Sequence, residues 1–265
     1  MRRTETAPAP VWRSMAGDLA AALDPVVFAQ RAGIEPFAWQ RRVLRSSARQ
    51  QLLCCSRQAG KSLVSATVAL HQAIFVPGST VLLLAPVGRQ SKELLAKVRD
   101  VYTDTAADGN PEADNQVTLK LANGSRIVVI PDKQANIRGF SAVSLLVIDE
   151  AAWVSDASYQ AIRPMLAVSQ GRVVLLSTPN GKRGFFHHEW TEGGDAWERT
   201  SITAPECPHI NQAWLADERR KIPSTVFDQE YLCVFGELED SAFHFEDIHA
   251  AISADVKPLF TREVA

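Results

Sequence analysis

A short loop between a predicted strand and a predicted helix is the feature that most limits what this chain can fold into. The strand is the apolar run 51–55, and the helix begins near Ser62. The loop reads Ser-Arg-Gln-Ala-Gly-Lys-Ser over residues 56–62. A loop that ends in Gly-Lys-Ser and opens a helix surrounds the phosphates of a nucleotide with backbone N–H groups. The sequence therefore predicts a phosphate-binding loop.

Two side chains of this loop carry the expected chemistry. We expect the ammonium group of Lys61 to reach the β and γ oxygens of a triphosphate, and the hydroxyl of Ser62 to bind magnesium. The commonest loop of this kind begins with a glycine, whereas this chain has Cys55 there. For the loop alone, a chance Gly-Lys-Ser at a helix start therefore stays open as an alternative. The residues predicted to hold the nucleotide are Ser56, Arg57, Gln58, Ala59, Gly60, Lys61 and Ser62.

Apolar runs and helical patterns alternate along the chain. Uninterrupted aliphatic runs are typical of strands covered on both faces, and apolar residues at helical spacing separate these runs. The predicted strands are 52–55, 81–85, 145–148 and 173–176, and the predicted helices are 14–32, 62–75, 89–101 and 157–167. This alternation predicts an α/β fold with a mainly parallel sheet and helices on both faces.

The stretch from 117 to 130 has a different pattern. Apolar and polar residues alternate over 117–121, and an apolar run covers 126–130. Asn123-Gly124 lies between them, a pair typical of tight turns between antiparallel strands. This stretch is therefore predicted to form a β-hairpin.

Two acidic residues follow the strand predicted at 145–148. Hydrolysis of a nucleotide needs a carboxylate that holds magnesium and a second one that polarises the attacking water. We assign the first role to Asp149 and the second to Glu150. The alternative is an ordinary helix start, where acidic residues are favoured in any case.

A third polar segment, Ser-Thr-Pro-Asn-Gly over 177–181, follows the strand predicted at 173–176. The hydroxyls of Ser177 and Thr178 could sense the γ-phosphate, and the alternative is an ordinary Pro-Asn-Gly turn. Ligands of parallel sheets bind beyond the carboxyl ends of the strands. We therefore expect this segment to meet Asp149 and the phosphate loop at one edge of the sheet.

Composition excludes several other classes of protein. Hydrophobic residues make up 46% of the 265 residues and charged residues 22%, which is ordinary for a globular protein. No apolar run reaches the roughly 18–20 residues of a membrane helix, so we expect no membrane partner. The formal charge of −2 gives no whole-chain sign of nucleic-acid binding, and any DNA contact would need a local basic patch. Four irregularly spaced cysteines favour a reduced cytosolic setting.

Together the three motifs resemble those of the large terminase subunits, the DNA-packaging motors of tailed bacteriophages and prophages. In that family the first loop glycine is often absent and an Arg-Gln pair lies inside the loop, as Cys55 and Arg57-Gln58 do here. The resemblance spans roughly residues 35–245. It implies a RecA-like P-loop ATPase of the ASCE type with a small helical lid. It also implies ATP and Mg²⁺ as cofactors, and ATP hydrolysis coupled to DNA translocation.

The resemblance assigns further residues. Trp39-Gln40 is similar to the family's adenine-binding segment, and the alternative is a helix with a buried Trp and a surface Gln. Arg138 is similar to a basic site proposed to act on ATP across a subunit interface, where it could stabilise transition-state charge. Arg57 is its rival for that role within one subunit, and a surface salt bridge is the alternative for Arg138. The expected catalytic residues are Glu150, Lys61, Arg57 and Arg138.

The resemblance also implies partners and a location. Double-stranded DNA, a portal protein and a small terminase subunit are the expected partners. The chain would form a homo-oligomeric ring on the procapsid, with a monomer in solution as the alternative. The expected location is the host bacterial cytoplasm and, transiently, the procapsid portal.

The domain organisation is expected to have four parts. Residues 1–13 form a lead-in, 14–190 the ATPase core, 191–250 a lid with two helices, and 251–265 a tail. We expect the ribonuclease H-like nuclease of full-length terminases, and its activity, to be absent. Two other functions stay open. A DNA-dependent helicase or remodelling ATPase usually carries a second RecA-like lobe, and a non-catalytic assembly protein would not need intact motifs.

Overall fold

An eight-stranded sheet forms the centre of the computed structural model, which describes residues 15–105, 111–132 and 139–237. The strand order is β3-β4-β5-β2-β6-β7-β1-β8. The strands from β5 to β8 in this order are parallel, and β3 and β4 are antiparallel at one edge. The strands are β1 (Gln50–Cys55), β2 (Thr80–Ala85), β3 (Ala113–Asn115), β4 (Thr118–Lys120), β5 (Arg126–Pro131), β6 (Leu145–Asp149), β7 (Arg172–Ser177) and β8 (Trp197–Ile202). The predicted mainly parallel sheet is confirmed.

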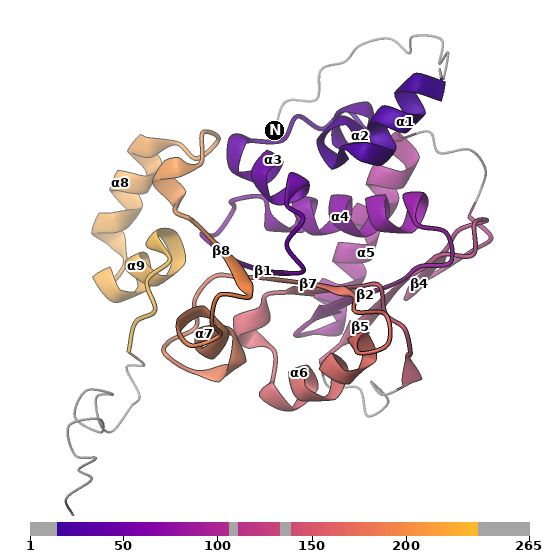
Figure 1. Cartoon of the computed structure of the whole chain (residues 1–265). Helices are drawn as coiled ribbons and strands as arrows, with labels where there is room; N and C mark the ends of the chain where they lie inside the picture. The colour runs from indigo at the N-terminus through magenta and orange to yellow at the C-terminus, as the bar shows by residue number, and fades with distance from the viewer. Residues whose placement is uncertain (1–14, 106–110, 133–138, 238–265) are drawn as a thin grey trace, which may run out of the picture.

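Helices cover both faces of this sheet, as Figure 1 shows. The helices α1 to α5 lie on one face, and α6 and α7 lie on the other. The α-helices are α1 (Met15–Leu23), α2 (Pro25–Arg31), α3 (Ala38–Arg45), α4 (Lys61–Phe75), α5 (Gly88–Asp104), α6 (Asp156–Ile162), α7 (Gly184–Thr191), α8 (Gln212–Lys221) and α9 (Ser224–Leu232). Short 3-10 helices are η2 (Ala151–Trp153), η3 (Arg163–Leu166) and η4 (Ala204–Glu206). Within the described ranges, every helix is too short or too polar to cross a lipid bilayer.

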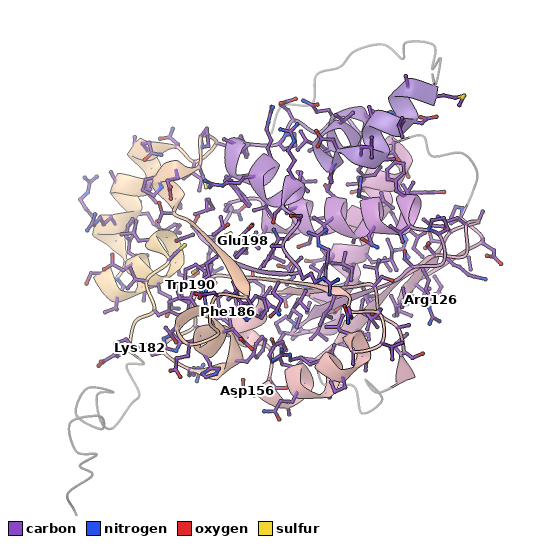
Figure 2. All side chains as sticks on the ribbon, in the orientation of Figure 1. Arg126, Asp156, Lys182, Phe186, Trp190 and Glu198 are labelled. Atoms are coloured by element: carbon purple, nitrogen blue, oxygen red, sulfur yellow. The ribbon has the colours of Figure 1, made fainter. Side chains whose placement is uncertain are left out.

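Two apolar layers hold the sheet between its helices. Alternate residues of a strand point to opposite faces, so Leu53 of β1 packs with the layer under α1 to α5 and Leu52 packs with the layer over α6 and α7. In this second layer Phe186 is fully buried, and Figure 2 shows it close to Trp190 of the same helix. Because both faces are covered, the central strands are apolar throughout.

The predicted hairpin is confirmed. Strands β4 and β5 are antiparallel, with Leu119 opposite Ile127. Gly124 has a φ of +81°, in the left-handed region that glycine adopts without a steric penalty. The Asn-Gly pair therefore provides the turn that joins the two strands.

The single helix predicted at 14–32 is wrong, because two helices occupy this stretch. Helix α1 ends at Leu23 and α2 begins at Pro25. Between them Asp24 is extended, and its side chain accepts a hydrogen bond from the Val26 N–H at 2.9 Å. Asp is a favoured N-cap, and a proline at the first helical position loses no hydrogen bond. Asp24-Pro25 therefore starts a new helix.

Strand β8 has no counterpart among the predicted strands. It pairs in parallel with β1, from Gln50 opposite Trp197 to Cys55 opposite Ile202. The residues between its two buried ends are polar and partly or fully exposed, because β8 lies at the edge of the sheet. Since the sheet continues past residue 190, we propose that the helical subdomain begins after Ile202.

That subdomain consists of η4, α8 and α9, and we call it the lid. Asn211 caps α8 by accepting hydrogen bonds from the backbone N–H groups of residues 213 and 214. A small separate core formed by Ala204, Leu215 and Phe227 holds the lid together. Figure 1 shows the lid beside the β1 and β8 edge of the sheet.

Candidate active site

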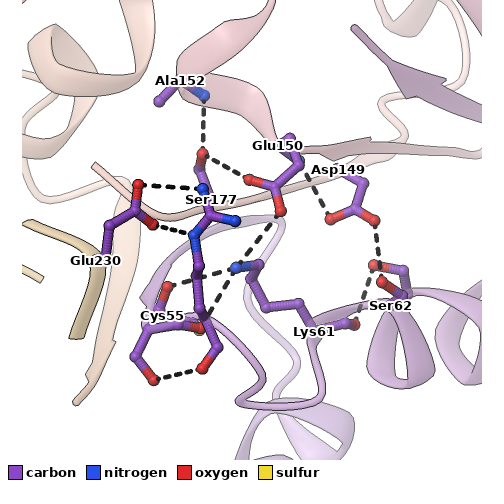
Figure 3. A network of polar contacts seen from close by, with 11 residues as sticks. Cys55, Lys61, Ser62, Asp149, Glu150, Ala152, Ser177 and Glu230 are labelled. Atoms are coloured by element: carbon purple, nitrogen blue, oxygen red, sulfur yellow. Dashed lines mark hydrogen bonds and ion pairs between the residues drawn. The ribbon is translucent and has the colours of Figure 1, made fainter. Parts of the chain in front are cut away.

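The three polar segments predicted to converge meet at the carboxyl ends of β1, β6 and β7 (Figure 3). The hydroxyl Oγ of Ser62 donates to Oδ2 of Asp149 at 3.3 Å. Lys61 Nζ lies 3.5 Å from Oε1 of Glu150, and Ser177 Oγ lies 3.5 Å from Oε2 of the same carboxylate. The structure therefore brings five of the predicted site residues into one cluster.

The backbone of the phosphate loop turns at two positions. Gln58 has a φ of +59° and Gly60 a φ of +97°, both in the left-handed region. Gly60 is the N-cap of α4, and Lys61 is the first residue of that helix. The free N–H groups at a helix N-terminus attract anions, so α4 begins where a phosphate would need to lie.

Cys55 explains why the loop needs no glycine at its first position. The residue is the last of β1, pairs with Ile202 of β8 and is fully buried in the apolar layer. The chain is still an extended strand there, and the tight turns come later, at Gln58 and Gly60. Burial also raises the pKa of the Cys55 thiol, which keeps the thiol neutral.

Lys61 is held inside the loop. Its side chain is only 8% exposed, and Nζ lies 3.5 Å from the carbonyl oxygen of Cys55 and 3.4 Å from that of Ser56. These contacts and the ion pair with Glu150 compensate the burial of the ammonium group. They are long for hydrogen bonds, so a phosphate oxygen could replace them readily.

Asp149 and Glu150 differ in their surroundings. Asp149 is buried, and burial raises the pKa of its carboxyl to about 6, with a smaller contribution from the charge of Glu150. Glu150 is more exposed and has a φ of +51°, a left-handed conformation that is strained for a non-glycine residue. Strain of this kind concentrates at functional sites. Here the carboxylate of the strained residue lies beside Lys61.

The donor set fits magnesium. Mg²⁺ prefers oxygen ligands and is commonly held by one or two protein groups together with substrate phosphates. Ser62 Oγ and the Asp149 carboxylate supply such oxygens side by side. No group of three or more His, Cys, Asp or Glu side chains forms a metal site in the described part of the chain. The site therefore suits a cation that arrives with its nucleotide.

The segment after β7 is bonded to the chain that follows Glu150. Ser177 Oγ accepts a hydrogen bond from the Ala152 N–H at 3.1 Å, and Asn180 Nδ2 donates to the Ala152 carbonyl at 3.2 Å. Thr178, the next residue after Ser177, is also buried. Ser177 therefore links its own strand to both the side chain of Glu150 and the backbone just beyond it.

Arg57 points toward the lid. Its guanidinium donates two hydrogen bonds to the carboxylate of Glu230 in α9, which is buried, and these bonds raise the pKa of Arg57. The backbone N–H of Arg57 also donates to the Glu230 carbonyl at 2.9 Å. Arg138, the rival for the role of catalytic arginine, lies outside the described residues.

Trp39 and Gln40 are both buried, so the alternative of a surface Gln is wrong for position 40. Its Oε1 accepts from the Phe37 N–H at 2.8 Å, and its Nε2 donates to the Gly60 carbonyl at 3.4 Å. A side chain that looks like a surface group in the sequence is therefore a strut between α3 and the phosphate loop. The Trp39 Nε1–H is buried and has no hydrogen-bond partner among the residues that the structure describes.

Two residues of this region were not predicted. His209 lies in the lid, and its Nε2 is 2.6 Å from the Gln58 carbonyl oxygen. Glu230 pairs with Arg57 from α9. Neither residue belongs to a local motif, and the two lie 151 and 173 positions, respectively, from their partners in the loop. Single-sequence patterns contain no signal for such contacts.

Comparisons with known proteins agree with this site. Residues 52–250 match the family described as "Terminase large subunit, T4likevirus-type, N-terminal". The chain is 26% identical to "Terminase, large subunit" of Thermus virus P23-45 over 82% of its own length and 52% of that protein. It is 24% identical to the same subunit of Escherichia phage T5 over 72% of its own length and 44% of that protein. The chain thus spans about half the length of these curated relatives.

Solved structures show the same fold. The large terminase ATPase domain of Thermus phage P74-26 superimposes with a TM-score of 0.68 at 23% identity, covering 78% of this chain and 97% of that one. The large terminase of another thermophilic bacteriophage, in complex with ADP, gives 0.61 at 10% identity, covering 79% of this chain and 53% of that one. The fold is therefore RecA-like. Because the family match covers most of the sequence, this chain belongs to the terminase large subunit family, in its T4likevirus-type N-terminal part.

Proposed function

We propose that this chain is the ATPase motor domain of a terminase large subunit, which hydrolyses ATP to drive double-stranded DNA into a viral procapsid. One observation carries the proposal of ATP hydrolysis. Lys61 and Ser62 of the phosphate loop lie within 3.5 Å of Glu150 and Asp149, respectively. A phosphate cradle and two carboxylates in contact supply the groups that nucleotide hydrolysis requires.

The residues have distinct proposed roles. Residues 56–62 hold the phosphates, and Lys61 neutralises their charge. Ser62 and Asp149 would hold the magnesium ion, which supplies charge stabilisation when it is bound. Glu150 accepts a proton from the attacking water. Ser177 contacts the Glu150 carboxylate and so orients it.

The proposed cofactors rest on the family and on the site. The thermophilic bacteriophage large terminase that shares this fold was solved with ADP and with ATP-gamma-S. The site of this chain offers a buried lysine and a pair of magnesium-type oxygen ligands. We therefore take Mg-ATP as the substrate, with Trp39 and Gln40 close to the base.

The partners follow from family membership. We propose double-stranded DNA, a portal protein and a small terminase subunit as partners, in a ring of identical subunits in the host bacterial cytoplasm. In such a ring Arg138 would act on the ATP of a neighbouring subunit. The pairing of Arg57 with Glu230 supports this assignment, because it directs Arg57 toward the lid.

A phosphate-release assay with and without double-stranded DNA tests the proposal. Wild-type protein should release phosphate from Mg-ATP, and Lys61→Ala should lose roughly 100-fold or more of that rate, since it removes a preorganised charge partner. Lys97→Ala is the matched control, because Lys97 is exposed on α5, and it should behave as wild type. Absent release under all conditions would favour a non-catalytic assembly protein. Strand separation by the wild type would favour a helicase.

A further inference from the structure

The chain around the lid contacts three successive residues of the phosphate loop. Two of the contacts use carbonyl acceptors: the Ser56 N–H donates to Ile202, just before the lid, at 2.8 Å, and the Arg57 N–H donates to Glu230 at 2.9 Å. The third contact has the opposite direction. His209 of the lid lies 2.6 Å from the Gln58 carbonyl oxygen through Nε2. A carbonyl oxygen can only accept a hydrogen bond, so Nε2 carries the hydrogen.

This third contact lies at the strained point of the loop. Gln58 has a φ of +59°, where a side chain with a Cβ costs roughly 1–2 kcal/mol compared with the right-handed region. The structure must compensate this cost locally for the loop to keep its shape. The hydrogen bond from His209 acts on the same residue and holds its carbonyl in a fixed direction.

A second contact fixes the imidazole ring itself. The rings of Phe37 and His209 are stacked, with centroids 4.8 Å apart and planes 10° from parallel. Phe37 precedes α3, and its N–H donates to the Gln40 side chain that bonds Gly60. Both left-handed residues of the loop are thus connected to the same support. His209 holds Gln58 from the lid, and Gln40 holds Gly60 from α3.

We propose that His209 is a positioning residue for the nucleotide, with Phe37 as the surface that sets its ring plane. By holding the left-handed turn at Gln58, His209 keeps the loop in the shape that receives phosphates. Because His209 belongs to the lid, the shape of the loop depends on the lid being in place. This inference rests on the proposed ATP site, and it adds a residue that no motif of the chain contains.

Two substitutions separate the hydrogen bond from the stacked ring. His209→Phe keeps an aromatic ring for Phe37 but has no donor, and His209→Gln keeps a donor without the ring. Losing one net hydrogen bond should weaken binding of Mg-N-methylanthraniloyl-ATP about fivefold, measured by fluorescence anisotropy. His209→Gln should recover part of this loss. The control is His188→Phe, because His188 is exposed on α7, and it should bind as wild type.

Single-turnover hydrolysis at saturating ATP gives the second measurement. Since His209 acts on the loop rather than on the reacting atoms, His209→Phe should keep a near wild-type rate once ATP is bound. The inference is overturned if His209→Phe binds as tightly as wild type or if His209→Gln shows no recovery. A loss of binding that only follows a lower unfolding midpoint also overturns it. Failure of the wild type to bind ATP would instead reject the proposed function itself.

Discussion

The guanidinium of Arg57 and the carboxylate of Glu230 form a two-point hydrogen-bonded ion pair, with N–O distances of 2.5 and 3.2 Å. Arg57 is in the phosphate loop and Glu230 in α9 of the lid. The same two residues also bond through their backbones. Side chain and main chain together therefore join the lid to the nucleotide site, and a change in either one reaches the other.

Replacing Glu230 should weaken this connection. Glu230→Gln removes the charge that two Arg57 nitrogens share, and the Glu230 side chain is only 11% exposed. We expect the free energy of unfolding to fall by about 1–2 kcal/mol, the low end for a charged hydrogen bond because Arg57 is largely exposed. Urea unfolding measures this change.

Asp217→Asn is the control for that substitution. Asp217 pairs with Arg220 and Lys221 on the exposed surface of α8. Exposed ion pairs contribute little, so this variant should change the free energy of unfolding by less than about 0.5 kcal/mol. Equal losses in both variants would show that the Arg57–Glu230 pair is no stronger than a surface pair.

Gly60→Ala should distort the phosphate loop. The residue has a φ of +97°, and a Cβ there would lie 2.8 Å from Nε2 of Gln40. We expect a loss of about 1–2 kcal/mol in unfolding free energy, together with weaker ATP binding. Thermal unfolding and nucleotide titration measure the two effects.

Gly88→Ala provides the comparison, because Gly88 begins α5, is outside the left-handed region and has free space for a Cβ. Alanine at such a site stabilises by reducing the freedom of the unfolded chain, by up to about 1 kcal/mol. If Gly60→Ala were as harmless as Gly88→Ala, the loop would not depend on the glycine conformation.

His71 should make stability depend on pH. The ring is packed against Phe28 and Phe75, and burial lowers its pKa below the ordinary value of about 6.5. The unfolded chain then binds a proton more readily than the folded one, so stability is full above about pH 6.5 and falls as the pH drops through the folded pKa. Thermal unfolding of His71→Phe between about pH 5 and 7.5 should show a smaller loss toward acid pH than wild type. The same slope in both proteins would exclude His71 as its source.

Much of the sheet and part of the site could be predicted from the sequence, because both depend on local patterns. The apolar strands 81–85 and 145–148 are covered on both faces, and this burial leaves a clear signature. The Lys61-Ser62 and Asp149-Glu150 motifs follow strands, so their meeting at one edge follows from a parallel sheet. Asn123-Gly124 likewise places the hairpin turn.

The rest depends on contacts between distant parts of the chain. Strand β8 is polar because it is an edge strand, so its sequence lacks the pattern of a buried one. Gln40 has no sequence sign of burial, since its partners are backbone groups of residues 37 and 60. Glu230 and His209 reach the loop only after the lid has folded against it.

Glu150→Gln tests the proposed hydrolytic site most directly. Radiolabelled Mg-ATP binding and single-turnover cleavage should be measured on the same samples of variant and wild type. The amide keeps the shape of the side chain but cannot accept the proton of the attacking water. We therefore predict binding close to that of wild type and cleavage slower by roughly 100-fold or more. Cleavage by Glu150→Gln at the wild-type rate would contradict the role of Glu150 and, with it, the proposed mechanism.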